Sequence, residues 1–192
     1  MTVVISQIIS IFESMNPVFY KTIAKSNASP KSRNVIARSV VENQYDSNEL
    51  ATIALNVADK NHYKAVWIFE VLAEENPELL LPYLETICET CPKYKHESAI
   101  RGMSRVVNFL STTVTISLTQ HQKEKLIEIN LDWLISDIKV APKVYAMYTL
   151  SHFMKEFDWL KEELQNIIEK DFYIQSAGYK AAAKEVLKKI NL

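Results

Sequence analysis

The sequence is poor in glycine and proline: only two of its 192 residues are Gly and six are Pro. Tight turns and phosphate-cradling loops need residues that adopt positive φ, so Gly-rich nucleotide-binding motifs are excluded. An excess of one charge is lacking too, because 22 Lys and Arg face 23 Asp and Glu and leave a formal net charge of -1. This balance does not favour wholesale binding to nucleic acid or to an anionic membrane, so any charged site must be local.

Cysteine and long apolar runs are also scarce. Two Cys residues cannot form a disulfide framework, and no window reaches the roughly 18 consecutive apolar residues that a membrane span needs. The apolar segment around residues 3–12 has no basic lead and no small-residue cleavage site, so we interpret it as an amphipathic helix and not as a targeting signal. We therefore expect a soluble, cytoplasmic protein.

What the sequence does contain is apolar residues at helical spacing, in segments bounded by clear helix-start signals. Hydrophobic residues make up 48% of the chain and recur at i, i+3, i+4 and i+7. We predict an all-α fold of about ten helices, with about two-thirds or more of the residues helical. In three places Pro directly follows a residue that is expected to start a helix. In two other places, a pair of side chains has the spacing that a capping box requires. These signals are Ser29-Pro30, Asn76-Pro77, Ala141-Pro142, Asp46 with Glu49, and Thr119 with Gln122.

A small residue followed mostly by apolar residues three, four and seven positions later recurs along the chain. Close packing against a neighbouring helix explains why the first position of each copy is small. The copies begin at Ala65, Ala99, Ala146 and Ala183, with a weaker one at Ala37. We expect their apolar positions to form the core, including Ile68, Phe69, Leu72, Met103, Val106, Leu150, Phe153 and Leu187. The alternating stretch Ser111 to Leu118 has no strand partner, so we predict an extended connector there.

The stretch Asp59 to Ile87 (DKNHYKAVWIFEVLAEENPELLLPYLETI) resembles short HEAT repeats, in which a helix of Arg-x-x-Ala-x-x-x-Leu type follows a polar turn. The resemblance covers roughly residues 30–192 and implies an armadillo-type, α-α superhelix of about five helical hairpins. It implies a single domain over 1–192, with N-terminal capping helices in 1–28, repeats in 29–192 and an insert near 111–118. The array is degenerate, because the family's Arg is replaced by Asn34, His62, His96, Lys143 and Lys180.

A weaker resemblance links the stretch from Ala37 to Leu84 to short helical proteins of Bacteroidetes-type bacteria that sometimes carry the label adenylosuccinate lyase. Enzymes of that name are much longer and use a Ser-rich mobile loop with catalytic Ser and His. This chain has no such loop. We therefore do not carry that activity over.

Residues with chemical reactivity do not form a recognisable catalytic or metal-binding pattern. Cys88 and Cys91 form a C-x-x-C near His96, but at a helix C-terminus, where the helix dipole opposes a thiolate. A zinc site would need His62 as a fourth ligand, so we expect no metal and no cofactor. His62 and His96 occupy equivalent turn positions, which favours structural hydrogen bonds over catalysis. We assign no catalytic residue.

The face of each Ala-anchored helix opposite the core is the strongest candidate for a binding surface. Helical residues advance about 100° each, so positions two before the anchor and two, five and six after it share this face. In HEAT-type stacking it lines the concave side. Aromatic residues and Arg, which are enriched at binding hot spots, occur there together. The candidate binding residues are Tyr63, Trp67, Glu70, Glu97, Arg101, Arg105, Tyr148 and His152.

Two interpretations of this face stay open. In the first, the protein is a non-enzymatic binding or scaffold module that presents the groove to a protein, a peptide or a small acidic ligand, with Arg101 and Arg105 holding an anion. In the second, the aromatic residues fill a closed interior and Glu70 or Glu97 pairs with Arg101, which leaves only a scaffold.

Two other classes of function are alternatives. One is a HEAT-like enzyme such as a DNA alkylation-repair glycosylase, and the other is a purely structural homo-oligomer. Glutamates on the concave face offset the arginines, so we expect a protein or peptide partner and neither nucleic acid nor membrane. We do not predict an enzyme.

Overall fold

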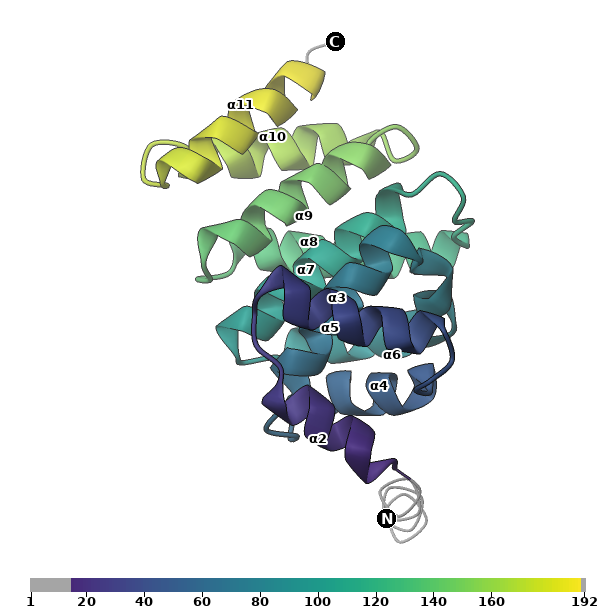
Figure 1. The fold of residues 1–192 in the computed structure, drawn as a ribbon. Helices are drawn as coiled ribbons and strands as arrows, with labels where there is room; N and C mark the ends of the chain where they lie inside the picture. The colour runs from purple at the N-terminus through teal and green to yellow at the C-terminus, as the bar shows by residue number, and fades with distance from the viewer. Residues whose placement is uncertain (1–14, 191–192) are drawn as a thin grey trace, which may run out of the picture.

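The computed structural model describes residues 15–190, and 76% of these lie in helices. Within this part of the chain there are ten α-helices, two short 3-10 helices and no strand. The prediction of an all-α fold is therefore confirmed, as Figure 1 shows. The amphipathic helix expected around residues 3–12 lies outside the described residues. None of the helices from residue 15 to residue 190 combines the length and apolarity that crossing a membrane requires.

The helices form two rows, and each hairpin contributes one helix to each row. The outer row contains α2 (Pro17–Lys25), α4 (Ser47–Ala54), α6 (Leu84–Thr90), α8 (Gln120–Ile135) and α10 (Trp159–Asp171), with the 3-10 helices η1 (Pro77–Tyr83) and η2 (Cys91–Lys93) on either side of α6. The inner row contains α3 (Pro30–Val41), α5 (His62–Glu75), α7 (Glu97–Thr112), α9 (Val140–Phe153) and α11 (Ala177–Ile190).

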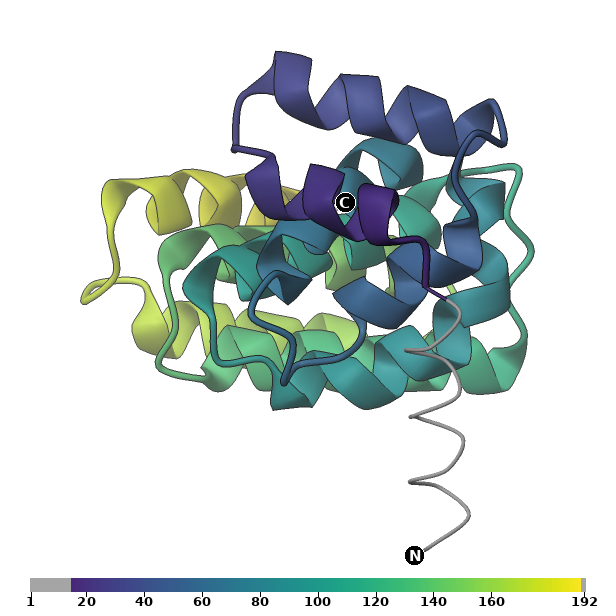
Figure 2. The ribbon, with the colours of Figure 1, turned by 60° about the horizontal axis from the view of Figure 1, so that its bottom comes forward.

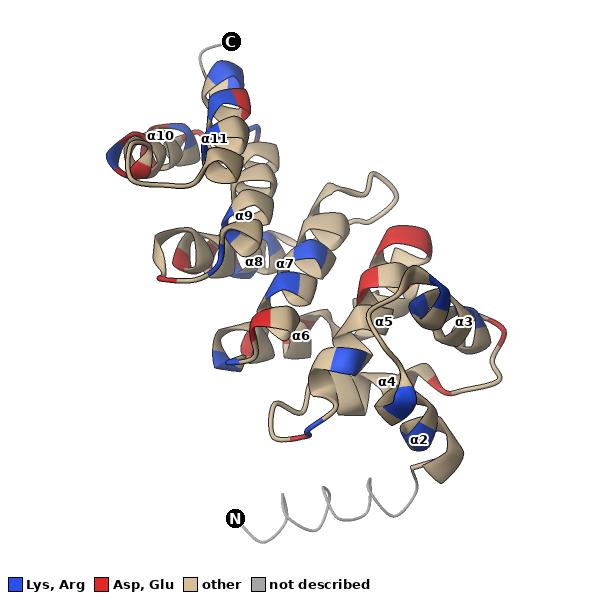
Figure 3. Cartoon of the chain, turned by 60° about the vertical axis from the view of Figure 1, so that its left-hand side comes forward, with Lys and Arg blue, Asp and Glu red and all other residues tan. Residues whose placement is uncertain are grey.

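The inner helices stack in chain order, and the stack curves. Helix α3 packs on α5, α5 on α7, α7 on α9, and α9 on α11. Figure 3 shows the inner row on the concave side of this curve, and Figure 2 shows the stack with its N-terminal helices foremost. The described chain therefore has the all-α, HEAT-like superhelical arrangement that the sequence predicts.

The repeated small residues lie where one inner helix approaches the next. All five anchors are buried, and they are Ala37, Ala65, Ala99, Ala146 and Ala183. Helices α5 and α7 approach each other closely at Gly102, three residues after the third anchor. A Cβ atom at this position would lie 2.5 Å from Cγ1 of Val66 on α5. Gly102 therefore allows α5 and α7 to pack more closely than any larger residue would.

The helix-start signals are mostly confirmed. Ser29 caps α3 by accepting a hydrogen bond from the backbone N–H of Ser32. Thr119 and Gln122 form the complete capping box at the start of α8. The signal at residues 76–77 starts the 3-10 helix η1. Pro142 is the third residue of α9, where the missing N–H would have no partner within the helix.

The capping box predicted at Asp46 and Glu49 is wrong. Asp46 does cap α4, because its side chain accepts from the backbone N–H of Asn48. The Glu49 carboxylate instead accepts from the backbone N–H of Asn16, at 2.9 Å. Because Asn16 lies 33 residues away in the chain, local spacing could not reveal this competition.

The predicted connector is shorter than expected. Ser111 and Thr112 complete the last turn of α7, and the connector follows at residues 113–119 without a strand. The hydroxyls of Thr112 and Thr113 each donate to the carbonyl four residues earlier, which satisfies acceptors at the end of the helix. Alternating Thr and Val residues are therefore compatible with a helix end as well as with an extended chain.

The expected core is also confirmed, except at its C-terminal end. Seven of the eight predicted core residues are buried, from Ile68 to Phe153. Leu187 is half-buried and packs against the edge of the core. Helix α11 is the last described helix, and within the described chain no further hairpin covers it.

Gly102→Ala is expected to destabilise the protein. The substitution gains about 1 kcal/mol of helix propensity, but the new methyl group meets Val66, and such overpacking costs about 1–3 kcal/mol. Gly178→Ala in α11 is the matched control, because there the nearest neighbour of a Cβ atom would be 3.9 Å away. Urea denaturation should show Gly102→Ala as less stable than the wild type and Gly178→Ala as equal to it or more stable. Equal gains from both substitutions would contradict the close approach of α5 and α7.

Candidate functional site

The inner row holds a buried carboxylate at its centre. Glu70, in the middle of α5, has a completely buried side chain surrounded by three guanidinium groups. Its Oε1 atom lies 2.9 Å from Nη1 of Arg105 and 3.4 Å from Nη2 of Arg101, and its Oε2 atom lies 3.3 Å from Nη1 of Arg33. A buried carboxylate needs such compensation, because its desolvation is costly. The cluster joins α3, α5 and α7, and Figure 3 shows basic positions of α7 across from acidic positions of α5.

Arg105 is the most firmly held of the three cations. Its Nη2 atom also contacts Oε2 of Glu74 at 2.7 Å, and its guanidinium lies 5.1 Å from the ring centre of Phe109. Burial opposes the charged form of Arg105, but the hydrogen bond to Glu70 and the charges of Glu74 and Glu70 outweigh it, so the pKa of Arg105 is raised. Arg105 therefore stabilises the packing of α7 against α5.

Arg101 and Arg33 are held less completely. The side chain of Arg101 is 45% exposed, against 24% for Arg105, and its contact with Glu70 is the longest of the three. Arg33 is more buried, but its Nε–H has no hydrogen-bond partner in the described structure. Both side chains therefore keep donor capacity beyond what Glu70 uses.

Aromatic side chains lie beside this cluster, one turn earlier on α5. The indole N–H of Trp67 donates to Oγ of Ser98 at 2.7 Å, which fixes the orientation of the ring. Tyr63 packs edge-on against Trp67, with the ring centres 5.2 Å apart, and stacks flat on His96, with the centres 4.1 Å apart. The half-buried Trp67 thus presents a rigid apolar wall next to the arginines.

A cleft of about 330 Å³ opens between Trp67 and the arginines. It lies where the turn before α3, the helices α3, α5 and α7, and the start of α9 meet. Its lining side chains include three cations, one carboxylate and one aromatic ring. The lining residues are Ala28, Arg33, Trp67, Glu97, Ser98, Arg101, Lys139, Ala141 and Pro142. Such a set can hold an anionic group through charge-assisted hydrogen bonds, with an apolar group beside it.

The structure brings most of the predicted site residues into one neighbourhood. Tyr63, Trp67, Glu70, Arg101 and Arg105 contact one another or share partners there. The pairing of Glu70 with Arg101 is one that we had considered for a closed interior. The 45% exposure of Arg101 and the adjoining cleft show that the inner face also has an open part.

The predicted site residue Glu97 lies at the rim of the cleft. It pairs with Lys139 and not with an arginine, at an N···O distance of 3.6 Å. Both side chains are about 70% exposed, at 71% for Glu97 and 72% for Lys139. An exposed pair of this kind contributes little to stability, so Glu97 and Lys139 can separate at low cost.

Tyr148 and His152 lie on α9 and are not among the residues that line the cleft. The Tyr148 hydroxyl donates to Oε2 of Glu185 on α11, at 3.1 Å. Burial and this hydrogen bond raise the pKa of Tyr148. Burial and the nearby Lys155 lower the pKa of His152. These two residues therefore lie outside the cleft, on the part of the inner row that α9 contributes.

Sequence reasoning missed Arg33, Ser98 and Lys139, which complete the cleft. Arg33 lies four residues before the anchor Ala37, on the flank of α3 that faces the neighbouring helix, and its long side chain reaches Glu70 from there. Ser98 and Lys139 lie at helix starts, outside the face that we considered. The rarity of arginine was an available signal, because three of the four Arg residues in the chain meet at Glu70.

The histidines at the turn positions make local hydrogen bonds, as predicted. Nδ1 of His62 donates to the backbone carbonyl of Asp59 at 2.6 Å. Nδ1 of His96 accepts from the backbone N–H of Ser98 and so caps α7.

The two cysteines are free and buried. Burial raises the pKa of Cys88 to about 11 and that of Cys91 well above its ordinary value. In residues 15–190 no group of three or more His, Cys, Asp or Glu side chains is placed to hold a metal ion. The absence of a metal stays a prediction.

Comparison with known proteins identifies a family. A family model described as a HEAT repeat domain matches residues 21–190, which is most of the chain. No curated protein matches the sequence.

Arg105→Ala is expected to cost more stability than Arg101→Ala. The first change removes the closest partner of the buried Glu70 and should cost about 2–3 kcal/mol, because part of a buried charge loses its compensation. The second removes a half-exposed partner and should cost less than about 1 kcal/mol. Urea denaturation measures both, with Arg38→Ala, at an exposed position of α3, as the control without effect. Equal losses for Arg101 and Arg105 would show that the three contacts are not ranked as described.

Both thiols are expected to resist alkylation in the folded protein. A pKa of about 11 for Cys88 leaves its thiol protonated at pH 8, so its thiolate fraction should be at least about a hundredfold below that of an ordinary Cys. Mass spectrometry after iodoacetamide treatment should show slow labelling in the native state and rapid labelling in guanidinium chloride. A chelator should leave the melting temperature unchanged. Rapid native labelling, or a fall in melting temperature with chelator, would contradict the assignment of these residues as buried, metal-free thiols.

Proposed function

This chain belongs to the HEAT repeat domain family, and we propose that it is a non-enzymatic binding module whose concave cleft holds an acidic segment of a partner protein. Helical repeat proteins use their extended concave surfaces for binding. One observation carries the proposal: the cleft of about 330 Å³ places the exposed part of Arg101 beside the fixed indole of Trp67. A carboxylate next to an apolar side chain fits these two groups.

The internal carboxylate supports binding by holding the cations in place. Glu70 contacts one side of Arg101 and of Arg33, and other N–H groups of both guanidiniums have no partner among residues 15–190. A guanidinium that is already oriented loses little conformational entropy when a ligand carboxylate arrives. Glu70 therefore acts as a positioning residue, and Arg101 as the residue that contacts the ligand.

The charge of the cleft favours a short acidic segment over a nucleic acid. Three cations line it, but Glu97 is part of the same lining and Glu70 lies directly behind it. Duplex binding needs several uncompensated cations along a continuous track. One or two carboxylates, in contrast, require only a local positive site. For this reason a peptide or protein partner is preferred here over the DNA-repair alternative.

The cellular setting in this proposal is the cytoplasm. Two free, buried thiols agree with a reducing compartment, where structural disulfides are rare. In that setting the protein acts as a scaffold or adaptor and carries out no reaction of its own.

The proposal predicts that an acidic peptide binds and that Arg101 is required. The probe is the fluorescein-labelled hexapeptide Asp-Asp-Leu-Leu-Asp-Asp, with Lys-Lys-Leu-Leu-Lys-Lys as its opposite-charge counterpart. Fluorescence anisotropy should show binding of the acidic peptide only. Arg101→Ala should raise its Kd by at least about tenfold, because a charge-assisted hydrogen bond is lost.

Lys184→Ala in α11 is the matched control, since it removes one exposed positive charge outside the cleft. It should leave the Kd unchanged. Equal binding of the two peptides, or equal loss in both variants, would overturn the proposal. Tighter binding of a short DNA duplex with the same dependence on Arg101 would overturn it in favour of the nucleic-acid alternative.

A further inference from the structure

One carboxylate of the cleft, that of Glu97, makes no ion pair with the buried cluster around Glu70. Glu97 is the first residue of α7 and is one of the residues that line the cleft. Its Oε1 atom lies 3.6 Å from Nζ of Lys139, which precedes α9 and lines the same cleft. In the part of the chain that the structure describes, this is the one ion pair that either residue makes. The Glu97–Lys139 pair is therefore separate from the Glu70 cluster.

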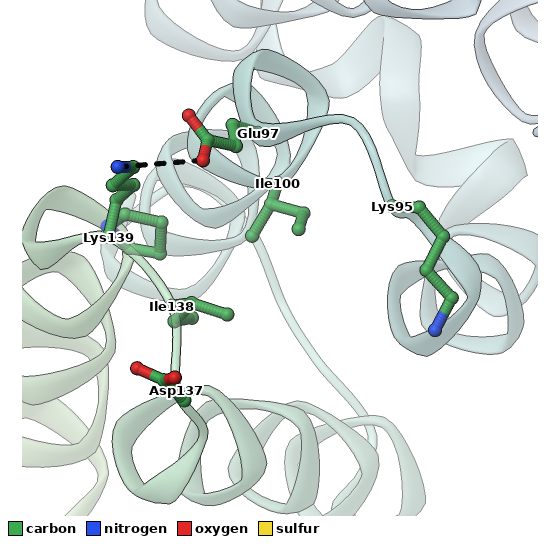
Figure 4. Close-up of a pocket in the computed structure, with 7 residues that line it drawn as sticks. Lys95, Glu97, Ile100, Asp137, Ile138 and Lys139 are labelled. Atoms are coloured by element: carbon green, nitrogen blue, oxygen red, sulfur yellow. Dashed lines mark ion pairs between the residues drawn. The ribbon is translucent and has the colours of Figure 1, made fainter.

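The Glu97–Lys139 pair is open to solvent. Figure 4 shows it across the gap between the first turn of α7 and the turn before α9, with the carboxylate of Asp137 apart from the Lys139 ammonium. Glu97 and Lys139 also line the hollow of about 380 Å³ that this figure draws. Their exposures of 71% and 72% leave both side chains space to turn, and an exposed pair of this length contributes little to stability.

Glu97 and Lys139 differ in what each loses when the pair separates. As the first residue of α7, Glu97 stays at the positive end of a helix dipole, where a carboxylate is favoured. Lys139 is at the start of α9, where the helix dipole disfavours a cation. A released Lys139 is therefore the group that gains most from a new carboxylate.

A count of charges gives the number of ligand carboxylates that suit the cleft. The buried cluster holds three arginines and two glutamates and so keeps one positive charge in excess. Its members are Arg33, Arg101, Arg105, Glu70 and Glu74. The half-exposed Arg101 presents this excess to the cleft. Lys139 provides a second positive charge once Glu97 turns away, so the cleft then matches two carboxylates.

The two cations lie close enough for one short segment to contact both. Arg101 and Lys139 line a single cleft of about 330 Å³. A sphere of that volume is about 9 Å across, and side chains two residues apart on an extended chain lie on one side of it, about 7 Å apart. Adjacent side chains point to opposite sides. Two acidic residues with one residue between them therefore fit the cleft.

Resting on the proposed function, we infer that Lys139 is a second ligand-binding residue of the cleft, and that Glu97 holds it in the free protein as an internal substitute for a ligand carboxylate. The bound segment carries two acidic residues with one residue between them. One acidic side chain contacts Arg101, and the other displaces Glu97 from Lys139. Glu97 thus makes the cleft selective, because a segment with one carboxylate gains nothing from breaking the pair.

The test compares two hexapeptides that have the same fluorescein label and amidated C-termini, on the chain of residues 1–192. Gly-Asp-Leu-Asp-Leu-Gly has two carboxylates, and Gly-Asp-Leu-Asn-Leu-Gly has one, with Asn as a neutral substitute of the same size. Fluorescence anisotropy should show that the wild type binds the two-acid peptide at least about threefold more tightly. Glu97→Gln should raise this preference to at least about tenfold, because the internal competitor is lost. Lys139→Gln should abolish it.

The double variant Glu97→Gln with Lys139→Gln distinguishes contact at Lys139 from a general effect of charge. It has the same net charge as the wild type, so a preference that depended only on local charge would return to the wild-type value. Binding at Lys139 requires that the preference stays lost. The matched controls are Glu163→Gln in α10 and Lys184→Gln in α11, which make the same single changes in charge at exposed positions outside the cleft. Both should keep the wild-type preference.

The outcomes separate this inference from the proposed function. If the two peptides bind equally well and Arg101→Ala weakens both, the proposed function stands and the roles of Glu97 and Lys139 are overturned. A preference that returns in the double variant also overturns them. If neither peptide binds, this inference is overturned, and the proposed function fails with it unless Asp-Asp-Leu-Leu-Asp-Asp still binds through Arg101. Circular dichroism of each variant confirms that it is folded.

Discussion

The buried carboxylate of Glu70 is the constraint on which the inner face depends. A charge without solvent contact must be compensated by nearby groups of opposite charge, and here that compensation comes from both neighbouring helices. This requirement draws α3 and α7 toward α5. Gly102 makes the approach possible on the α7 side, because a side chain there would collide with Val66. The cleft lies beside this cluster, near the N-terminal ends of α3 and α7.

Under the proposed function, the same cluster contributes both to stability and to binding. Arg105 is largely enclosed and shared between two glutamates, so it stabilises the stack. Arg101 has its other side open to the cleft. Because Glu70 neutralises part of the positive charge, the cleft is suited to a small number of carboxylates and not to a polyanion. Under the proposed function, this balance lets an almost neutral protein hold an anionic group at Arg101.

The departures from the family pattern concentrate at the turn edge of the stack. Where short HEAT repeats have Arg three residues before the anchor, this chain has His62 in the second hairpin and His96 in the third. His62 binds the backbone of its own turn, and His96 caps α7 and stacks on Tyr63. Aromatic stacking and local hydrogen bonds therefore shape this edge in the second and third hairpins. A hollow lies directly beyond them, between the start of α7 and the turn before α9.

The sequence by itself determined the features that depend on neighbours along the chain. Helical periodicity of about 100° per residue identified the all-α fold, the buried anchors and the shared face of Trp67, Glu70 and Arg101, because these depend only on spacing within one helix. Only the tertiary structure decided which groups meet between helices. Arg33 reaches Glu70 from 37 residues away, and Glu49 contacts the start of α2 instead of its own helix. Such pairings depend on how closely and at what angle the helices pack. This packing is determined jointly by side chains from several distant segments of the chain.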